Sequence, residues 1–172
     1  YLAVSTDTGC FRYGNATADT FKTASELIAL GVDNGEINRV VFETKTREYI
    51  DFETRAMGTI ETYFGGKCAI MTLSKKLFEE TGLCEAETHA VTALPRQIEG
   101  VAAGVVFKER DNGIYKISLR SNEPFSAADV CETLGGGGHR LAAGCDVEGP
   151  LEKAKEKVLG AVYAELKNKG LV

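Results

Sequence analysis

The residues best suited to chemistry are four consecutive glycines that end in a histidine, from Gly135 to His139. Glycine loses more backbone freedom on folding than any other residue, so a folded chain keeps such a run where a side chain would obstruct something. A phosphate that approaches backbone N–H groups is a common reason. The histidine adds a titratable donor or acceptor to the same place. The run therefore predicts a loop that binds a phosphate or a nucleotide.

The glycine run also has other interpretations. It is not a P-loop, because no Lys-Ser/Thr pair follows, and it is not a dinucleotide fingerprint, because it follows a predicted helix rather than a strand. A flexible loop or a tight helix-to-strand turn is the alternative without a ligand. His139 and the nearby pair Arg120-Ser121 favour the ligand, since the planar fork of a guanidinium suits a phosphate. An ordinary solvated arginine at position 120 stays open.

Asp7 is the candidate metal ligand near the start of the chain. It lies in a cluster of short polar residues that follows Tyr1 to Val4. Those four residues have the pattern of a strand that begins before the first residue of the chain. The carboxylate suits a hard cation such as Mn²⁺ or Mg²⁺, or it belongs to a turn and accepts its own backbone N–H groups. A two-metal site needs several Asp and His ligands. Nothing else near this end of the chain supplies them, and the abrupt start suggests a fragment of a longer protein.

Periodicity and turn signals give the elements that position these residues. We expect helices over residues 17–31, 33–43, 46–57, 74–81 and 126–133, and a last one from 150. We expect strands over residues 1–4, 59–64, 67–73, 101–108, 114–120 and 141–147. In the strand 114–120, alternation places Lys116, Ser118 and Arg120 on one face, opposite an apolar face.

Composition narrows the class of protein. A hydrophobic content of 44% and a charged content of 26% are typical of a soluble globular protein, and no apolar stretch approaches the roughly 20 residues of a membrane span. The net charge of −5 argues against a protein that coats long nucleic acid. Five scattered cysteines without a C-x-x-C pattern predict free thiols in a reducing cytoplasm, not a disulfide scaffold or a zinc site.

Two groups of motifs resemble the DHH phosphoesterases. The stretches that resemble their DHHA1 domain are Asp129-Val130, Gly135-Gly136-Gly137-Gly138-His139, Ala142-Ala143-Gly144-Cys145, Ile117-Ser118-Leu119-Arg120-Ser121 and Ile98-Glu99-Gly100-Val101. The stretch from Thr6 to Tyr13, continuing to Asn15-Ala16-Thr17, resembles the last metal-binding motif of their catalytic DHH domain. The motifs stand in the family's order and cover nearly the whole chain. They look most similar to the nanoRNase (oligoribonuclease) and pAp phosphatase branch.

The resemblance implies an α/β fold in which the C-terminal tail of a parallel-sheet DHH domain and a helical linker precede a mixed-sheet DHHA1 domain. The expected bounds are 1–45, 46–58 and 59–172. It also implies a parent enzyme that hydrolyses short oligoribonucleotides from the 3′ end, pAp, or both, with Mn²⁺ or Mg²⁺. The implied site residues are Asp7 for metal, Arg120 and Ser121 for phosphate, and Gly136, Gly137, Gly138 and His139 for the nucleotide.

The family's earlier metal motifs are missing, so this chain is expected to bind short single-stranded RNA or DNA, dinucleotides or pAp without hydrolysing them, and to hold no metal by itself. A DHHA1 nucleic-acid-binding module without chemistry is the alternative, and part of a cyclic-dinucleotide phosphodiesterase is another. The severed first part is expected to expose apolar surface and an unpaired strand edge, which favours self-association into a homodimer.

Overall fold

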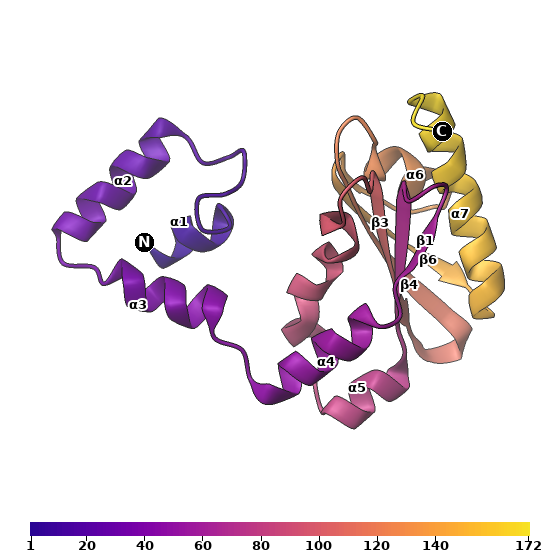
Figure 1. Ribbon diagram of the computed structural model, residues 1–172, viewed down its shortest axis with the longest axis horizontal. Helices are drawn as coiled ribbons and strands as arrows, with labels where there is room; N and C mark the ends of the chain where they lie inside the picture. The colour runs from indigo at the N-terminus through magenta and orange to yellow at the C-terminus, as the bar shows by residue number, and fades with distance from the viewer. The chain divides into compact units, whose positions relative to one another are not determined.

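The computed structural model describes residues 1–172 and divides into two compact units, Tyr1–Thr46 and Arg47–Val172. The first unit is helical (Figure 1). It contains α1 (Leu2–Asp7), α2 (Ala18–Ala29), α3 (Asn34–Asn38) and a π-helical turn η1 (Arg39–Glu43). Thr17 begins α2 as part of a capping box, and the Asp33 side chain accepts a hydrogen bond from the backbone N–H of Glu36 to begin α3.

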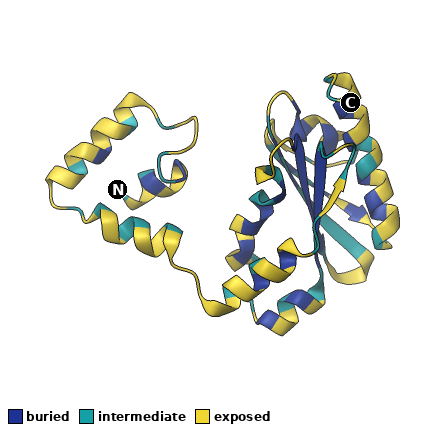
Figure 2. Ribbon diagram, in the orientation of Figure 1, coloured by how far each residue is buried: buried dark blue, intermediate teal, exposed yellow.

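The predicted strand at Tyr1 to Val4 is wrong. These residues enter α1, in which the N–H of Ser5 donates to the carbonyl of Tyr1 at 2.8 Å. A four-residue apolar run fits a helix as well as a strand, and too few residues precede Asp7 for a period to show. The unit therefore has no strand edge. Most of this unit is exposed (Figure 2). The expected apolar exposure is present in the side chains of Leu2, Phe21, Leu30 and Val40.

The second unit is built on a six-stranded mixed sheet with the order β1-β2-β3-β4-β6-β5, which confirms the expected fold class. Only β2 and β3 run parallel, and every other neighbouring pair is antiparallel. The strands are β1 (Glu61–Tyr63), β2 (Cys68–Leu73), β3 (Ala103–Glu109), β4 (Ile114–Ser121), β5 (Gly137–His139) and β6 (Ala142–Glu148).

The predicted strands over 59–64 and 67–73, and those over 101–108 and 114–120, form two antiparallel hairpins. The turn between β1 and β2 contains Gly65 and Gly66, which both have positive φ, as a tight turn requires. The second hairpin joins β3 and β4 across the short 3₁₀ turn η4 (Asp111–Gly113). The alternation along β4 is also as predicted, because Ile117 and Leu119 are fully buried whereas Arg120 on the other face is half-buried.

Helices cover the two faces of this sheet differently. One face packs against α6 (Ala127–Thr133) and α7 (Leu151–Asn168) to form the larger core (Figure 1). The other face packs against α4 (Arg47–Met57), α5 (Lys75–Thr81) and the 3₁₀ segments η2 (Glu85–Ala93) and η3 (Pro95–Gln97). The buried sheet residues of that smaller core come from β2 and β3 and none from β4, β5 or β6. The polar side of β4 and its neighbours is therefore not part of that smaller core.

The expected helix between the two parts is present as α4, and its own contacts place it in the second unit. Phe52 and Ala56 are fully buried in the smaller core, and the rings of Phe52 and Phe78 lie 5.0 Å apart between centroids. None of the helices is long and apolar enough to cross a membrane.

Candidate functional site

The glycine run forms an edge strand rather than the predicted loop. Gly137 to His139 make up β5, which pairs antiparallel with β6 so that Gly137 lies opposite Gly144 and His139 opposite Ala142. Gly135, with φ +83°, ends the turn after α6. The alternative of a helix-to-strand turn is correct for the start of the run, which turns the chain after α6, and the rest of the run forms a strand of the sheet.

Two glycines of the run are explained by packing alone. A Cβ on Gly136 would lie 2.2 Å from the carbonyl oxygen of Gly144 and 2.4 Å from the Cβ of Cys145. A Cβ on Gly138, which has φ +150°, would lie 2.6 Å from the Cα of Ala143. These positions are glycine because β5 approaches the backbone of β6 too closely for any side chain.

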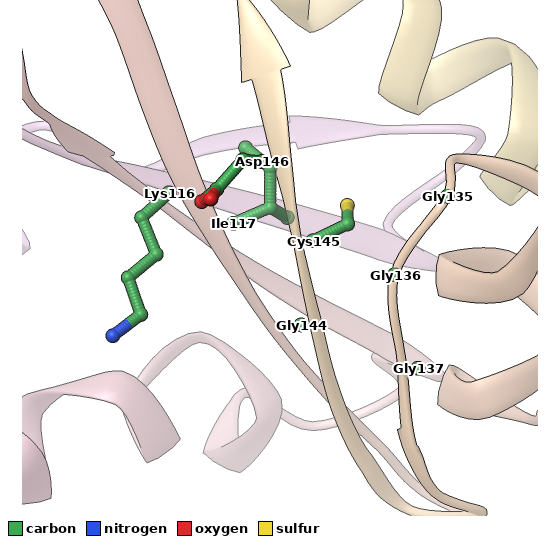
Figure 3. Close-up of a pocket in the computed structure, with 8 residues that line it drawn as sticks. All are labelled: Lys116, Ile117, Gly135, Gly136, Gly137, Gly144, Cys145 and Asp146. Carbon is green, nitrogen blue, oxygen red and sulfur yellow. The ribbon is translucent and has the colours of Figure 1, made fainter.

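Gly137 is different, because a Cβ there would meet nothing within 4 Å. It lines a depression of about 470 Å³ with Gly135, Gly136, Gly144, Cys145, Asp146, Ile117 and Lys116. Figure 3 shows the glycine segment running alongside the strand that carries Gly144 to Asp146, with the Lys116 side chain extending away from them. Gly137 therefore leaves space for a ligand, and so does Gly135, where an added Cβ would also meet nothing within 4 Å.

The sheet register places three of the predicted binding residues, Arg120, Gly137 and His139, on one face of the sheet. His139 lies opposite Ala142, and Ala142 lies opposite Arg120, so the three form one row across β5, β6 and β4. In the next row Gly137, Gly144 and Ser118 are aligned in the same way. With neighbouring strands about 4.8 Å apart, the backbones at His139 and Arg120 are about 10 Å apart, with Ala142 between them. Neither Arg120 nor His139 is among the residues that line the depression beside Gly137.

Arg120 is a half-buried cation without a carboxylate partner. Its only hydrogen bond runs from Nη1 to the carbonyl oxygen of Leu119 at 3.1 Å. Burial lowers the pKa of its guanidinium, and the positive charge of Arg96 lowers that pKa further. Because a partly desolvated charge without a partner is unfavourable for the fold, such a group is typical of a ligand site.

Ser121 lies on the opposite face of β4 from Arg120. It is fully buried, and its hydroxyl donates to the carbonyl oxygen of Phe125 at 3.1 Å and lies 3.5 Å from that of Arg140. Its contact with a phosphate stays a prediction. The structure gives the hydroxyl a different role, which is to hold the return segment between β4 and α6.

Replacing Ser121 with alanine separates the two roles. We expect Ser121→Ala to lower the free energy of unfolding by about 1 kcal/mol, since one buried hydrogen bond is lost, and to leave nucleotide affinity within about twofold. Urea unfolding and a nucleotide titration measure the two effects. A large loss of affinity at unchanged stability would instead assign Ser121 to the phosphate.

Asp7 is the last residue of α1 and is exposed, and Oδ2 accepts a hydrogen bond from Asn15 Nδ2 at 3.1 Å. No group of three or more His, Cys, Asp or Glu side chains that could hold a metal ion occurs in the structure. Asp7 is thus not part of such a cluster in this structure, and its role as a metal ligand stays a prediction.

A network of charges that the sequence did not suggest lies beside the depression. Glu85 of η2 accepts hydrogen bonds or ion pairs from Lys108 at 3.1 Å, from Lys116 at 2.9 Å and from Arg110. Burial raises the pKa of Glu85, but the hydrogen bonds of Lys116 and Lys108 outweigh it and lower the pKa to about 2. These three cations share one carboxylate as an ion-pair partner, whereas Arg120 has none.

Arg96 is a cation near Arg120 that the sequence did not suggest. It belongs to η3, and a Cβ on Gly104 would lie 2.5 Å from its backbone nitrogen. The one available signal was Gly104 itself, because a glycine within a strand of branched residues often marks a close backbone approach. Nothing in the sequence indicated which segment makes that approach.

The sheet order and the half-open face define an α/β domain of the DHHA1 type, and comparison with known proteins agrees. The family model described as "DHHA1 domain" matches residues 65–168, and the chain belongs to this family. The chain is 34% identical over 169 residues to the bifunctional oligoribonuclease and PAP phosphatase NrnA of Thermus thermophilus, which covers 97% of this chain and 50% of that protein. It is 30% identical over 164 residues to the cyclic-di-AMP phosphodiesterase PdeA of Listeria monocytogenes, covering 95% of this chain and 23% of PdeA.

A solved structure supports the fold. The crystal structure of an exopolyphosphatase-related protein from Bacteroides fragilis superposes with a TM-score of 0.84 at 25% identity, over 93% of this chain and 47% of that chain. The resemblance to the nanoRNase and pAp phosphatase branch is thereby confirmed. The chain spans about half the length of the Thermus relative and of the Bacteroides protein.

Proposed function

We propose that this chain is the nucleotide-binding part of a DHH-family phosphoesterase that hydrolyses short oligoribonucleotides and pAp. The observation that carries the proposal is Arg120, a half-buried guanidinium with no carboxylate partner beside a floor of small residues. A guanidinium in this setting gains most from an anion with oxygen acceptors, and a phosphate is the natural one. The similarity to an oligoribonuclease and PAP phosphatase supports a nucleotide as the group that carries the phosphate.

The proposal extends to the division of labour within the longer protein. Asp7 would be one ligand of a Mn²⁺ pair whose other ligands come from a segment outside these 172 residues. Such metals activate water and stabilise the charge that develops on the phosphate oxygens. This chain would supply binding and orientation of the nucleotide, and would not hydrolyse it alone. The compartment in which we place the protein is the cytoplasm.

The experiment compares the 172-residue chain with the longer protein that contains it. Both are titrated with pAp and assayed for release of phosphate from pAp and of mononucleotides from a dinucleotide, with and without Mn²⁺. We expect both proteins to bind pAp and only the longer one to hydrolyse, in a Mn²⁺-dependent manner. Hydrolysis by the short chain would contradict the division of labour, and the absence of pAp binding by either would contradict the proposed function.

A second candidate is favoured by the similarity to cyclic-di-AMP phosphodiesterase PdeA. The same assay with cyclic di-AMP distinguishes them, since a cyclic substrate has no terminal phosphate. Binding by the longer protein without hydrolysis of any of these substrates would favour a binding module without chemistry.

A further inference from the structure

Arg96 and Arg120 are brought together by a contact between η3 and β3. Gly104 of β3 lies directly opposite Arg120 of β4 in the sheet register. A Cβ on Gly104 would lie 2.5 Å from the backbone nitrogen of Arg96 and 2.9 Å from its Cα. The missing side chain at Gly104 thus lets the backbone of Arg96 rest on the sheet immediately beside Arg120.

The side chain of Asn122 fixes this arrangement. Its Nδ2 donates to the carbonyl oxygen of Arg96 at 3.2 Å and to that of Val101 at 2.9 Å. Its Oδ1 accepts a long hydrogen bond from Arg96 Nη1 at 3.4 Å. Asn122 directly follows the last residue of β4, so it ties the segment that carries Arg96 to the strand that carries Arg120.

Neither guanidinium has an anionic partner. Arg96 forms no ion pair, and its Nε is buried without any hydrogen-bond acceptor. Arg120 donates only to the carbonyl oxygen of Leu119. Four other arginines, Arg39, Arg55, Arg110 and Arg140, each pair with a carboxylate. Two neighbouring, partly buried cations with an unused buried donor are unfavourable unless an anion joins them.

We propose that Arg96 and Arg120 together bind the terminal phosphomonoester of a nucleotide, and so select for a free phosphate end over an internal phosphodiester. A terminal phosphate carries close to two negative charges at pH 7 and three acceptor oxygens, which match two guanidiniums. An internal phosphodiester carries one charge and leaves one cation uncompensated. The inference rests on the proposed function and names the chemistry that Arg96 adds to it.

The test is a set of titrations of the ¹⁵N-labelled 172-residue chain followed by NMR. The ligands are 5′-AMP, 3′-AMP, adenosine and the dinucleotide ApA, which has an internal phosphodiester and no terminal phosphate. We expect one or both of the AMP isomers to bind at least about tenfold more tightly than ApA, and the two isomers to show which end of a nucleotide is held. The Nε–H signal of Arg96 is expected to shift with AMP and not with adenosine.

The variant Arg96→Gln removes the charge and the fork of donors. We expect it to weaken AMP binding by about tenfold or more and ApA binding by less than about twofold. Lys153→Gln is the matched control, since Lys153 is an exposed cation on α7, which covers the other sheet face; it should leave both affinities within about twofold. Arg96→Lys keeps the charge without the fork, and should keep part of the preference for AMP if the glutamine variant fails to fold.

The outcomes separate the two proposals. Equal binding of AMP and ApA by the unmodified chain, or an equal loss for both ligands in Arg96→Gln, would overturn the inference and leave the proposed function standing. Absence of binding for AMP, ApA and pAp alike would overturn the proposed function, and the inference with it.

Discussion

Gly136→Ala is expected to lower the free energy of unfolding by about 2–3 kcal/mol, whereas Gly137→Ala, one residue along, changes it by less than about 0.5 kcal/mol. At Gly136 the added Cβ would lie 2.2 Å from the Gly144 carbonyl oxygen, and this neighbour is backbone that cannot turn aside. At Gly137 the same methyl group would meet nothing within 4 Å. The difference follows from which side of the strand each position faces.

For nucleotide binding we expect the opposite order, with the larger effect in Gly137→Ala. The methyl group of Gly137→Ala projects into the depression and is expected to weaken nucleotide binding while the fold is preserved. Urea unfolding monitored by circular dichroism, together with a nucleotide titration of each folded variant, measures both effects. Equal stability of Gly136→Ala and Gly137→Ala would contradict the packing role, and unimpaired binding in Gly137→Ala would remove this glycine from the ligand floor.

Arg120→Met is expected to weaken nucleotide binding by about 10–100-fold and, at the same time, to raise the free energy of unfolding by about 0.5–2 kcal/mol. The loss of binding reflects lost charge-assisted hydrogen bonds to the phosphate. The gain in stability arises because methionine fills a similar volume without a half-buried charge that lacks a carboxylate and lies beside Arg96. In the longer protein, the variant should raise KM more than it lowers kcat, since ground-state binding is what is lost.

Arg55→Met is the matched control for Arg120→Met. Arg55 pairs with Glu80 and Asp51 on the surface of α4 and α5, so its replacement is expected to leave binding unchanged and not to stabilise the fold. A thermal or urea unfolding curve and a titration are recorded for both variants. If Arg120→Met destabilised the chain and left binding intact, the guanidinium would be a structural group and the site would have to lie elsewhere.

Much of the second unit could be predicted from local patterns. The helices predicted over residues 74–81 and 126–133 are present as α5 and α6, capped by Ser74 and Ser126, and the glycine pair at 65 and 66 makes the turn of the first hairpin. Alternation along β4 correctly separated Arg120 from Ile117 and Leu119. These signals succeed because each depends on neighbours within one turn or one strand.

The errors arose where distant contacts decide the structure. The segment at Tyr1 to Val4 is too short for a period, and β5 contains two glycines that are poor strand formers and pair only because β6 lies beside them. Ser121 lies on the opposite face of β4 from Arg120 in the structure, although the two residues together were expected from the sequence to support a phosphate ligand. The proximity of Arg96 to Arg120 could not be predicted from the sequence, since it depends on contacts of η3 with Gly104 and Asn122.

The division of tasks within the glycine run bears on how such a motif changes during evolution. Gly136 and Gly138 are required by the approach of two backbones, so the fold should retain them in a descendant that no longer binds nucleotides. Gly137 has no such requirement. A relative that keeps glycine at positions 136 and 138 but carries a bulky residue at position 137 is expected to keep the fold and not to bind a nucleotide. We therefore expect the residue at position 137, rather than the presence of the whole run, to distinguish domains that bind a nucleotide from those that do not.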